Sequence, residues 1–133
     1  MDIKKLISEA FIAQSSSYSP YSGCKVGAAL LCKNGKIFRG CNIENASFSA
    51  TNCAERTAIF KAVSEGINEF EAISIVGNNG NDEFFYPCGI CLQVMKEFCD
   101  NDFRVIIAKN EDEYKIYNLS ELIPFGFDKE NVK

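Results

Sequence analysis

Three cysteines and a glutamate, carried by two short motifs, constrain this chain more than any other feature. The first motif is Cys53-Ala54-Glu55-Arg56, and the second is Pro87-Cys88-Gly89-Ile90-Cys91. If two helices begin side by side here, Cys53 lies in the first turn of one helix, and Cys88 and Cys91 lie in the first turn of the other. A helix N-terminus carries partial positive charge, which lowers a thiol's pKa and favours the thiolate that zinc binds. The spacing therefore predicts that three sulfurs meet at one metal ion.

The residue types at this predicted metal site indicate catalysis. Three protein ligands leave the fourth tetrahedral position of zinc open to water, and zinc makes that water acidic enough to yield hydroxide near neutral pH. Glu55 lies two residues after Cys53, where its carboxylate can carry protons beside the metal. The chain contains no histidine, so imidazole is excluded as a ligand or a base. We therefore expect an all-thiolate zinc site with Glu55 as its proton carrier.

Each motif also has a simpler interpretation. A CxxC pair occurs in redox proteins and in structural zinc sites, and Cys41 or Cys99 would be the fourth ligand of a structural metal. A redox dithiol needs no third cysteine, however, and neither Cys41 nor Cys99 has a CxxC partner. Asn52 and Glu55 also fit an N-cap with a capping-box acid, which is worth about 1 kcal/mol to a helix. The combination of Cys53 with the CxxC motif favours the catalytic site.

Length and composition indicate one globular domain spanning residues 1–133. A chain of 133 residues buries roughly two thirds of its unfolded surface. Its net charge of −4 argues against a nucleic-acid polymer as partner, because such binding depends on clustered Lys and Arg. We find neither a signal peptide nor an apolar run approaching the roughly 18 residues of a membrane span, so no membrane partner is expected. Seven cysteines without a secretory signal then favour the cytoplasm.

The pattern of apolar residues predicts alternating strands and helices. Helices are expected at 2–15, 53–65 and 88–98, strands at 26–32, 37–40, 72–76, 105–108 and 114–117, and a helical turn at 119–122. Asn34-Gly35 predicts a hairpin, Gly66 ends the second helix, and Pro87 opens the third. The alternation implies parallel neighbours with right-handed crossovers, and the hairpin adds an antiparallel edge. The expected fold class is α/β, a three-layer α/β/α sandwich around a five-stranded mixed sheet.

Four further cysteines have no metal-ligand spacing. The simplest expectation is that each is a small buried apolar residue: Cys24, Cys32, Cys41 and Cys99.

The two metal motifs together resemble the zinc-dependent nucleoside and nucleobase deaminases. The run Gly40-Cys41-Asn42-Ile43-Glu44-Asn45-Ala46 narrows the resemblance to the small three-cysteine cytidine deaminases, and the similarity extends from Tyr18 to Pro124. The resemblance implies one zinc ion per subunit and hydrolytic deamination of cytidine and 2′-deoxycytidine to uridine and 2′-deoxyuridine, with release of ammonia, in pyrimidine salvage. It also implies a small-molecule nucleoside as substrate and a homotetramer whose subunits share their active sites.

The resemblance assigns roles to individual residues. Glu55 would protonate N3 of the pyrimidine, deprotonate the zinc water as it attacks C4, and protonate the departing ammonia. Asn42 and Glu44 match the pair that binds the ribose hydroxyls, although by sequence alone they are equally well explained as residues that hold turns. Buried polar groups of this kind reject a substrate that lacks the hydroxyl, so a nucleoside is favoured over free cytosine.

The other implied substrate contacts are mainly apolar. Ala54 and Ile90 match positions that frame the base. Ala46, Phe48 and Phe127 match positions that in the family reach the pocket of a neighbouring subunit, whereas the simpler role for Phe127 is in the chain's own core. Three thiolates leave zinc with a formal charge of −1, so a donor to the sulfurs is needed. Arg56 is the candidate, and its alternative is a surface arginine on a helix.

Three positions depart from the family. Cys24 stands where a Phe usually packs on the pyrimidine, so base stacking is weaker or is supplied elsewhere. Phe48 replaces a Tyr, and Leu92 replaces an Arg that often follows the CxxC motif. A deaminase of a nucleoside-like antibiotic would share the metal motifs, but Asn42-Ile43-Glu44 and Ala46 argue against it. The alternative from another class is a structural zinc module that mediates interactions.

Overall fold

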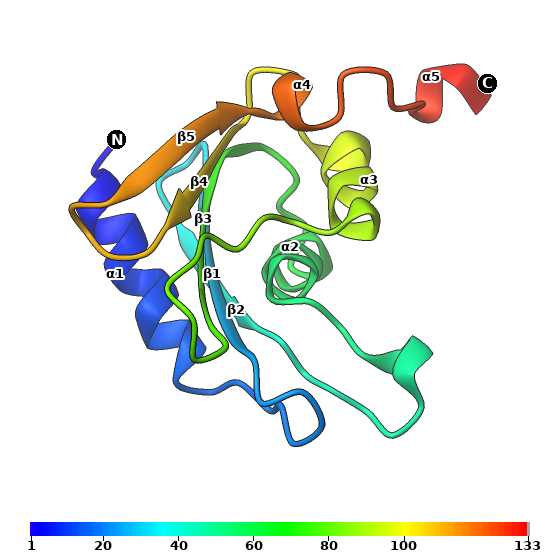
Figure 1. The fold of residues 1–133 in the computed structure, drawn as a ribbon. Coiled ribbons are helices and arrows are strands. Elements are labelled where there is room, and N and C mark those ends of the chain that lie inside the picture. The colour runs from blue at the N-terminus through cyan, green and yellow to red at the C-terminus, as the bar shows by residue number, and fades with distance from the viewer. Residues whose placement is uncertain (133) are drawn as a thin grey trace.

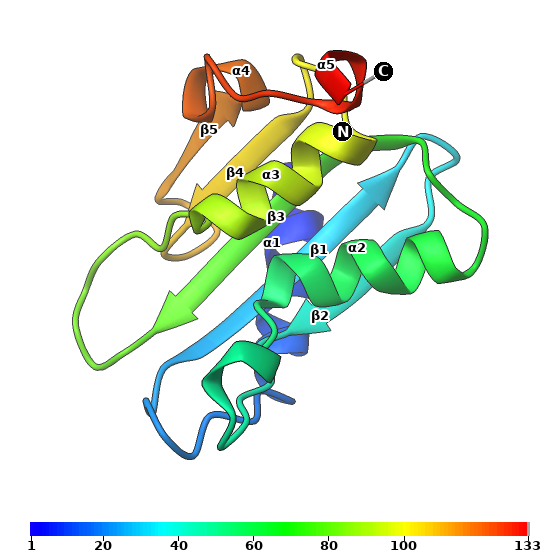
Figure 2. The ribbon, with the colours of Figure 1, turned by 90° about the vertical axis from the view of Figure 1, so that its right-hand side faces the viewer.

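The protein folds into three layers, with helices on both faces of one five-stranded sheet (Figures 1 and 2). The computed structural model describes residues 1–132, so of the predicted domain only Lys133 lies outside the described residues. The sheet has the order β2-β1-β3-β4-β5, formed by β1 (Lys25–Cys32), β2 (Ile37–Cys41), β3 (Phe70–Asn78), β4 (Arg104–Ala108) and β5 (Tyr114–Asn118). The main helices are α1 (Ile3–Gln14), α2 (Ala54–Ser64) and α3 (Gly89–Phe98). The predicted α/β/α sandwich is therefore confirmed.

The strand directions differ in part from the prediction of parallel neighbours. Only β3 and β4 are parallel among the described pairs, whereas β1 runs antiparallel to both β2 and β3, and β5 runs antiparallel to β4. The crossover through α2 does join two strands of the same direction, β2 and β3, but β1 lies between them. The sheet consequently has an antiparallel pair at each edge.

Several element ends also differ from those predicted. Strand β3 continues past its predicted end at Val76, because Gly77 and Asn78 pair with Val26 and Lys25 of β1. Pro87 precedes the N-cap of α3 and does not open the helix itself. Three short elements complete the chain: the 3₁₀ turn Phe48–Ala50, α4 (Leu119–Leu122), which was expected, and α5 (Lys129–Val132), which was not. None of the helices within residues 1–132 has the length and hydrophobicity needed to cross a membrane.

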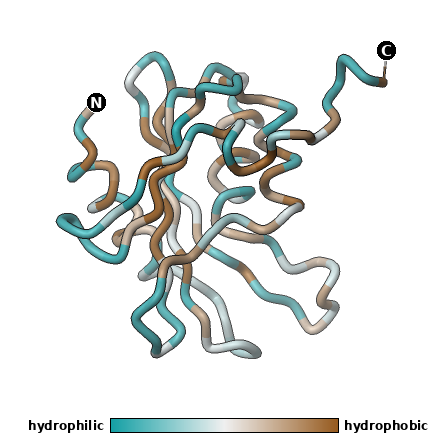
Figure 3. Tube along the Cα trace, turned by 45° about the horizontal axis from the view of Figure 1, so that its top comes forward, coloured by the Kyte–Doolittle hydropathy of each residue, from teal (hydrophilic) through white to brown (hydrophobic). Residues whose placement is uncertain are grey.

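The apolar side chains form one cluster on each face of the sheet. The larger cluster lies under α2 and α3 and includes Ile59, Ile73 and Met95, and the smaller one lies under α1 and includes Leu6 and Ile7. The central strands are correspondingly the most hydrophobic part of the trace in Figure 3. Of the four cysteines expected inside, only Cys32 is buried. The prediction is wrong for three that lie in loops or at element ends and stay partly exposed: Cys24, Cys41 and Cys99.

Gly40 allows α2 to lie directly on strand β2. A Cβ atom at this position would come within 2.4 Å of the carbonyl oxygen of Ala54 and 2.5 Å of the nitrogen of Ala58. Those two residues belong to the N-terminal part of α2, on either side of Glu55 and Arg56. The missing side chain at Gly40 therefore sets the height of these two candidate site residues above the sheet.

Candidate functional site

The sulfurs of Cys53, Cys88 and Cys91 meet between the starts of α2 and α3. All three Sγ atoms lie within 4.8 Å of one another, and those of Cys53 and Cys88 are 3.8 Å apart. Tetrahedral zinc with Zn–S distances of about 2.3 Å separates its sulfurs by about 3.8 Å, so the cluster fits this ion. Cys53 and Cys88 are the N-caps of their helices, one position before the predicted first turn, and neither side chain caps the backbone. Both sulfurs can therefore face a metal.

Arg56 contacts two of the three sulfurs. Its Nη2 lies 3.2 Å from Cys53 Sγ, and its Nε lies 3.4 Å from Cys91 Sγ. A hydrogen bond from Cys91, together with the Arg56 guanidinium, lowers the pKa of the Cys53 thiol to about 5. These contacts favour the thiolate form of Cys53, the form that binds zinc. The guanidinium points at the cluster, unlike that of a surface arginine.

Glu55 is buried beside the same sulfurs, with 4% of its surface exposed. Burial raises the pKa of its carboxyl to about 7, so the group can take up and release a proton near neutral pH. The capping-box alternative for Glu55 is wrong, because the N-cap of α2 is Cys53 and the Asn52 amide donates instead to Thr57 Oγ1. The carboxyl of Glu55 instead lies within hydrogen-bond reach of its own backbone N–H and of the Cys91 thiol.

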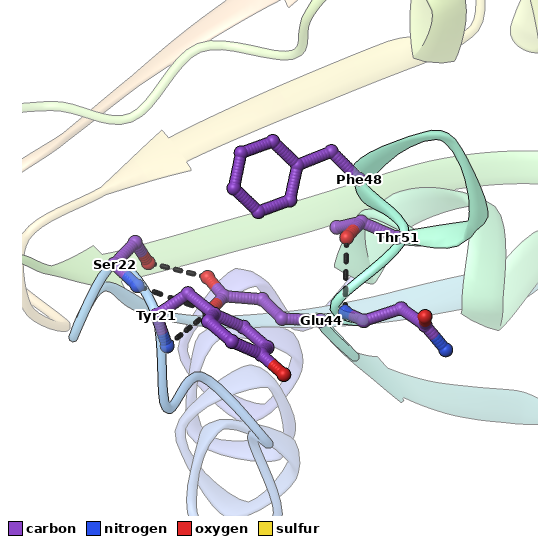
Figure 4. Close-up of a pocket in the computed structure, with 6 residues that line it drawn as sticks. Tyr21, Ser22, Glu44, Phe48 and Thr51 are labelled. Atoms are coloured by element: carbon purple, nitrogen blue, oxygen red, sulfur yellow. Dashed lines mark hydrogen bonds between the residues drawn. The ribbon is translucent and has the colours of Figure 1, made fainter.

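A cavity of about 250 Å³ opens beside the sulfurs. It brings Ala54 and Glu55 at the start of α2 together with residues from four other segments of the chain. Its further lining includes Ser22, Cys24, Val26, Asn42, Glu44, Ile75, Phe85 and Tyr86. A second cavity of about 340 Å³ adjoins it through Ser22, Glu44 and Thr51, and Phe48 lines it across from Tyr21 (Figure 4). Together the two cavities connect the sulfur cluster to the surface.

Asn42 holds the loop that precedes β1. Its Oδ1 accepts hydrogen bonds from the Ser17 hydroxyl and from the Val26 N–H at 3.0 Å, and its Nδ2 donates to the Cys24 carbonyl at 2.8 Å. The side chain is almost fully buried. Both lone pairs of the amide oxygen are thus used, and one of the two N–H groups remains.

Glu44 binds the neighbouring part of the same loop. Its Oε1 accepts from the N–H groups of Tyr21 and Ser22 at 2.9 and 3.1 Å, and its Oε2 accepts from the Ser22 hydroxyl (Figure 4). Hydrogen bonds from the Ser22 hydroxyl and from the backbone hold the pKa of this carboxyl below its ordinary value. Glu44 is therefore a fixed carboxylate with one accepting site of Oε2 still open.

Four predicted substrate residues lie outside the cavity beside the sulfurs. Ile90 and Phe127 are 62% and 60% exposed, Ala46 is exposed as well, and Phe48, 76% exposed, lines only the adjoining cavity. No motif or periodicity in the sequence points to a role for five residues that the structure places at the two cavities or against Asn42: Ser17, Tyr21, Ser22, Phe85 and Tyr86. The run from Tyr18 to Ser22 was part of the family resemblance, but nothing in it signalled contact with Asn42 and Glu44, which follow about twenty residues later.

The family described as "Cytidine and deoxycytidylate deaminase zinc-binding region" matches residues 1–108, which include the three clustered cysteines and Glu55. The chain belongs to the cytidine deaminase family. Among the cytidine deaminases, the protein of Sporosarcina psychrophila is 44% identical over 132 residues, covering 99% of this chain and 96% of its own. The cytidine deaminase of Halalkalibacterium halodurans is 46% identical over 132 residues, with 99% and 98% covered. The family resemblance noted in the sequence is confirmed.

Solved structures agree with this assignment. The crystal structure of cytidine deaminase from Burkholderia pseudomallei matches with a TM-score of 0.86 and 42% identity, covering 92% of this chain and 97% of its own. This deaminase is accordingly a zinc-dependent enzyme, and its cluster of three sulfurs fits one zinc ion per subunit.

Proposed function

We propose that this deaminase converts cytidine and 2′-deoxycytidine to uridine and 2′-deoxyuridine with release of ammonia, as a step of pyrimidine salvage. The observation that carries the proposal is the place of Glu55: a buried carboxyl with a pKa of about 7, beside three sulfurs, on the wall of a cavity that also contains Asn42 and Glu44. We propose further that residues 1–133 act as one catalytic domain.

Glu55 carries the protons of the proposed reaction. When bound, zinc supplies a water that is acidic enough to be the nucleophile near neutral pH. Glu55 passes one proton of the attacking water to N3 of the pyrimidine, and then passes the second proton of that water to the amino group, which leaves as ammonia. A C4–O bond forms and the C4–N bond breaks, so one water and one cytidine yield one uridine and one ammonia.

Asn42 and Glu44 together fit one sugar hydroxyl. The N–H left on Asn42 Nδ2 would donate to the hydroxyl oxygen, and the open site on Glu44 Oε2 would accept the hydroxyl proton. Loss of that hydroxyl from the substrate would leave the N–H of the buried Asn42 unpaired, which costs far more than the loss of an apolar contact. A nucleoside is thus favoured over free cytosine.

The proposed assembly is a homotetramer in which Ala46, Phe48 and Phe127 reach a neighbour's site. Its support is the exposure of aromatic side chains that would otherwise face water, since Phe127 is 60% exposed and Phe48 76% exposed. Ile90 at the start of α3 is similarly exposed, and we propose that it frames the base once this assembly has formed. The cytoplasm is the proposed location, because seven free thiols suit a reducing compartment.

The test measures turnover by the zinc-loaded protein of four compounds: cytidine, 2′-deoxycytidine, free cytosine and a nucleoside-like antibiotic. Turnover is monitored as the loss of absorbance at the cytidine band. Zinc is measured in the same sample. Turnover of both nucleosides, with little turnover of cytosine or the antibiotic, is expected. Bound zinc without turnover of any of the four compounds would indicate a structural zinc module and overturn the proposal.

A further inference from the structure

Among the described residues, Phe85 and Tyr86 are the aromatic side chains that line the cavity beside the sulfurs. We propose that the ring of Phe85 is the face on which the substrate's pyrimidine base packs, which makes Phe85 a specificity-determining residue. This inference rests on the proposed function, because it presumes a pyrimidine nucleoside in the cavity.

The ring of Phe85 is seated directly on strand β3. A Cβ atom at Gly77 would lie 2.3 Å from Cγ and 2.5 Å from Cδ2 of Phe85, so the ring occupies the space that a side chain at this position would fill. Phe85 also packs against the larger hydrophobic cluster, under the face of the sheet that carries α2 and α3. The loop that carries Phe85 thereby presents a ring fixed in place before any substrate binds.

The ring of Phe85 forms part of an apolar floor of the cavity, and strand β1 continues this floor towards Cys24. Gly77 pairs with Val26 of β1, and Ile75 pairs with Ala28, so Val26 and Ile75 lie beside the Phe85 ring on one face of the sheet. Cys24 precedes Val26 by two positions and lines the same cavity, but its thiol is small. The floor between the sulfurs and the Glu44 end of the cavity is therefore apolar, and the ring of Phe85 is its largest rigid part.

The aromatic residues on either side of Phe85, Phe84 and Tyr86, make contacts outside the floor of the cavity. The Tyr86 hydroxyl lies 2.9 Å from that of Tyr117, and Tyr86 is 48% exposed, which places it at the rim of the cavity. The ring of Phe84 lies under the ammonium groups of Lys109 and Lys115, at 4.6 and 4.7 Å from its centroid, and does not line the cavity. Phe84 and Phe85 are both half-buried, so Phe84 is a matched control for Phe85.

Aromatic packing on a base acts on the bound substrate and the transition state alike. Loss of such packing weakens affinity by roughly 5- to 10-fold. Because the contact stabilises substrate and transition state equally, its loss raises KM and leaves kcat unchanged. Phe85→Leu is therefore expected to raise KM for cytidine by roughly 5- to 10-fold at a similar kcat, and to weaken inhibition by uridine to the same degree. Phe85→Tyr keeps the ring and should keep KM.

The experiment compares wild type, Phe85→Leu, Phe85→Tyr and the control Phe84→Leu in steady-state assays, with melting temperature measured for each. If Phe85→Leu does not fold, Phe85→Met replaces the ring by a chain of similar size and repeats the test. Adding Cys24→Phe to the Phe85→Leu protein is expected to lower KM again, because a ring at position 24 would cover the same floor.

A KM for Phe85→Leu within twofold of wild type, or an equal rise in KM for Phe84→Leu, would overturn the role of Phe85. Failure of the zinc-loaded wild type to convert cytidine would instead overturn the proposed function on which this inference rests. The two failures are distinguished by the wild-type assay alone.

Discussion

Nη2 of Arg56 lies 3.2 Å from Sγ of Cys53, and the Nε of the same guanidinium contacts Cys91. Three thiolates and Zn²⁺ have a formal charge of −1, which makes the metal a weaker Lewis acid than a site with neutral ligands. A cation hydrogen-bonded to two of the sulfurs draws charge away from them. Leu92, directly after the CxxC motif, adds no second cation. Arg56 and the two helix N-termini are therefore the groups that draw charge from the sulfurs.

The first prediction concerns that guanidinium. Arg56→Gln should leave zinc bound but lower kcat by about 10- to 100-fold, since the change acts through the sulfurs. The acidic limb of the pH–rate profile should move to higher pH, because a less polarised water holds its proton more tightly. Leu92→Arg should restore part of the rate in this background. The control is Arg39→Gln, whose guanidinium pairs with Glu9 on the opposite face. A wild-type rate and pH profile for Arg56→Gln would show that the helix N-termini suffice.

The second prediction concerns Glu55. Glu55→Gln should keep the fold and the zinc while lowering kcat by about 10⁴-fold or more, at or above the upper end for general acid–base catalysis, because one carboxyl moves several protons per turnover. Zinc content and kcat are measured together. The matched control is Glu65→Gln, at the other end of α2, where the carboxylate is exposed and pairs with Lys36. A Glu55→Gln enzyme with a tenth of the wild-type rate would contradict the role of proton carrier.

The third prediction concerns the pH dependence of Glu44. The Ser22 hydroxyl holds the pKa of this carboxyl below its ordinary value, so the carboxylate persists at neutral pH and is lost only as pH falls through the lowered pKa. Ser22→Ala should raise that pKa, so that KM for cytidine begins to rise at a higher pH than in wild type. Carbon NMR titration of the Glu44 carboxyl measures the shift. Ser64→Ala, at the far end of α2, should change neither quantity.

The fourth prediction concerns the C-terminal segment. Phe127→Ala, or truncation before Pro124, should lower activity far more than the melting temperature, because Phe127 is 60% exposed in the single chain and is expected to complete a neighbour's site. Gel filtration should show a tetramer for the intact protein. The neighbouring Phe125→Ala separates the role of this ring from a general loss of apolar surface. A fully active monomer would contradict the shared site.

The sequence predicted the parts of this protein that depend on local signals. The spacing of Leu6, Ile7 and Ala10 was enough for α1, and the metal motifs were enough to place three sulfurs at two helix starts. Residues whose role depends on partners distant in the chain were not recovered. The predicted strand 72–76 stops short of Asn78, because the pairing of Asn78 with Lys25 leaves no signal in the residues around it.

The residues that line the substrate cavity also depend on partners distant in the chain, so the sequence predicts their contacts poorly. Glu44 was identified through the family resemblance, but its partners Tyr21 and Ser22 stand 23 and 22 residues away, and loop hydrogen bonds of this kind have no period. The role of Phe85 cannot be predicted from the sequence, because a single aromatic residue in a polar loop follows no periodic pattern. The ring of Phe85 can pack on β3 only because Gly77, which faces it, has no side chain.

Cys53 and Cys88 are 35 residues apart in the chain, and their sulfurs are 3.8 Å apart in space. A single ion held by both is a cross-link that closes the whole crossover from α2 through β3 to α3. Closing such a loop removes conformational entropy from the unfolded chain, and structural metal sites couple binding to folding in this way. The ion that activates water would thus also act as a staple, so chelation should loosen α2 from α3 as well as stop the chemistry.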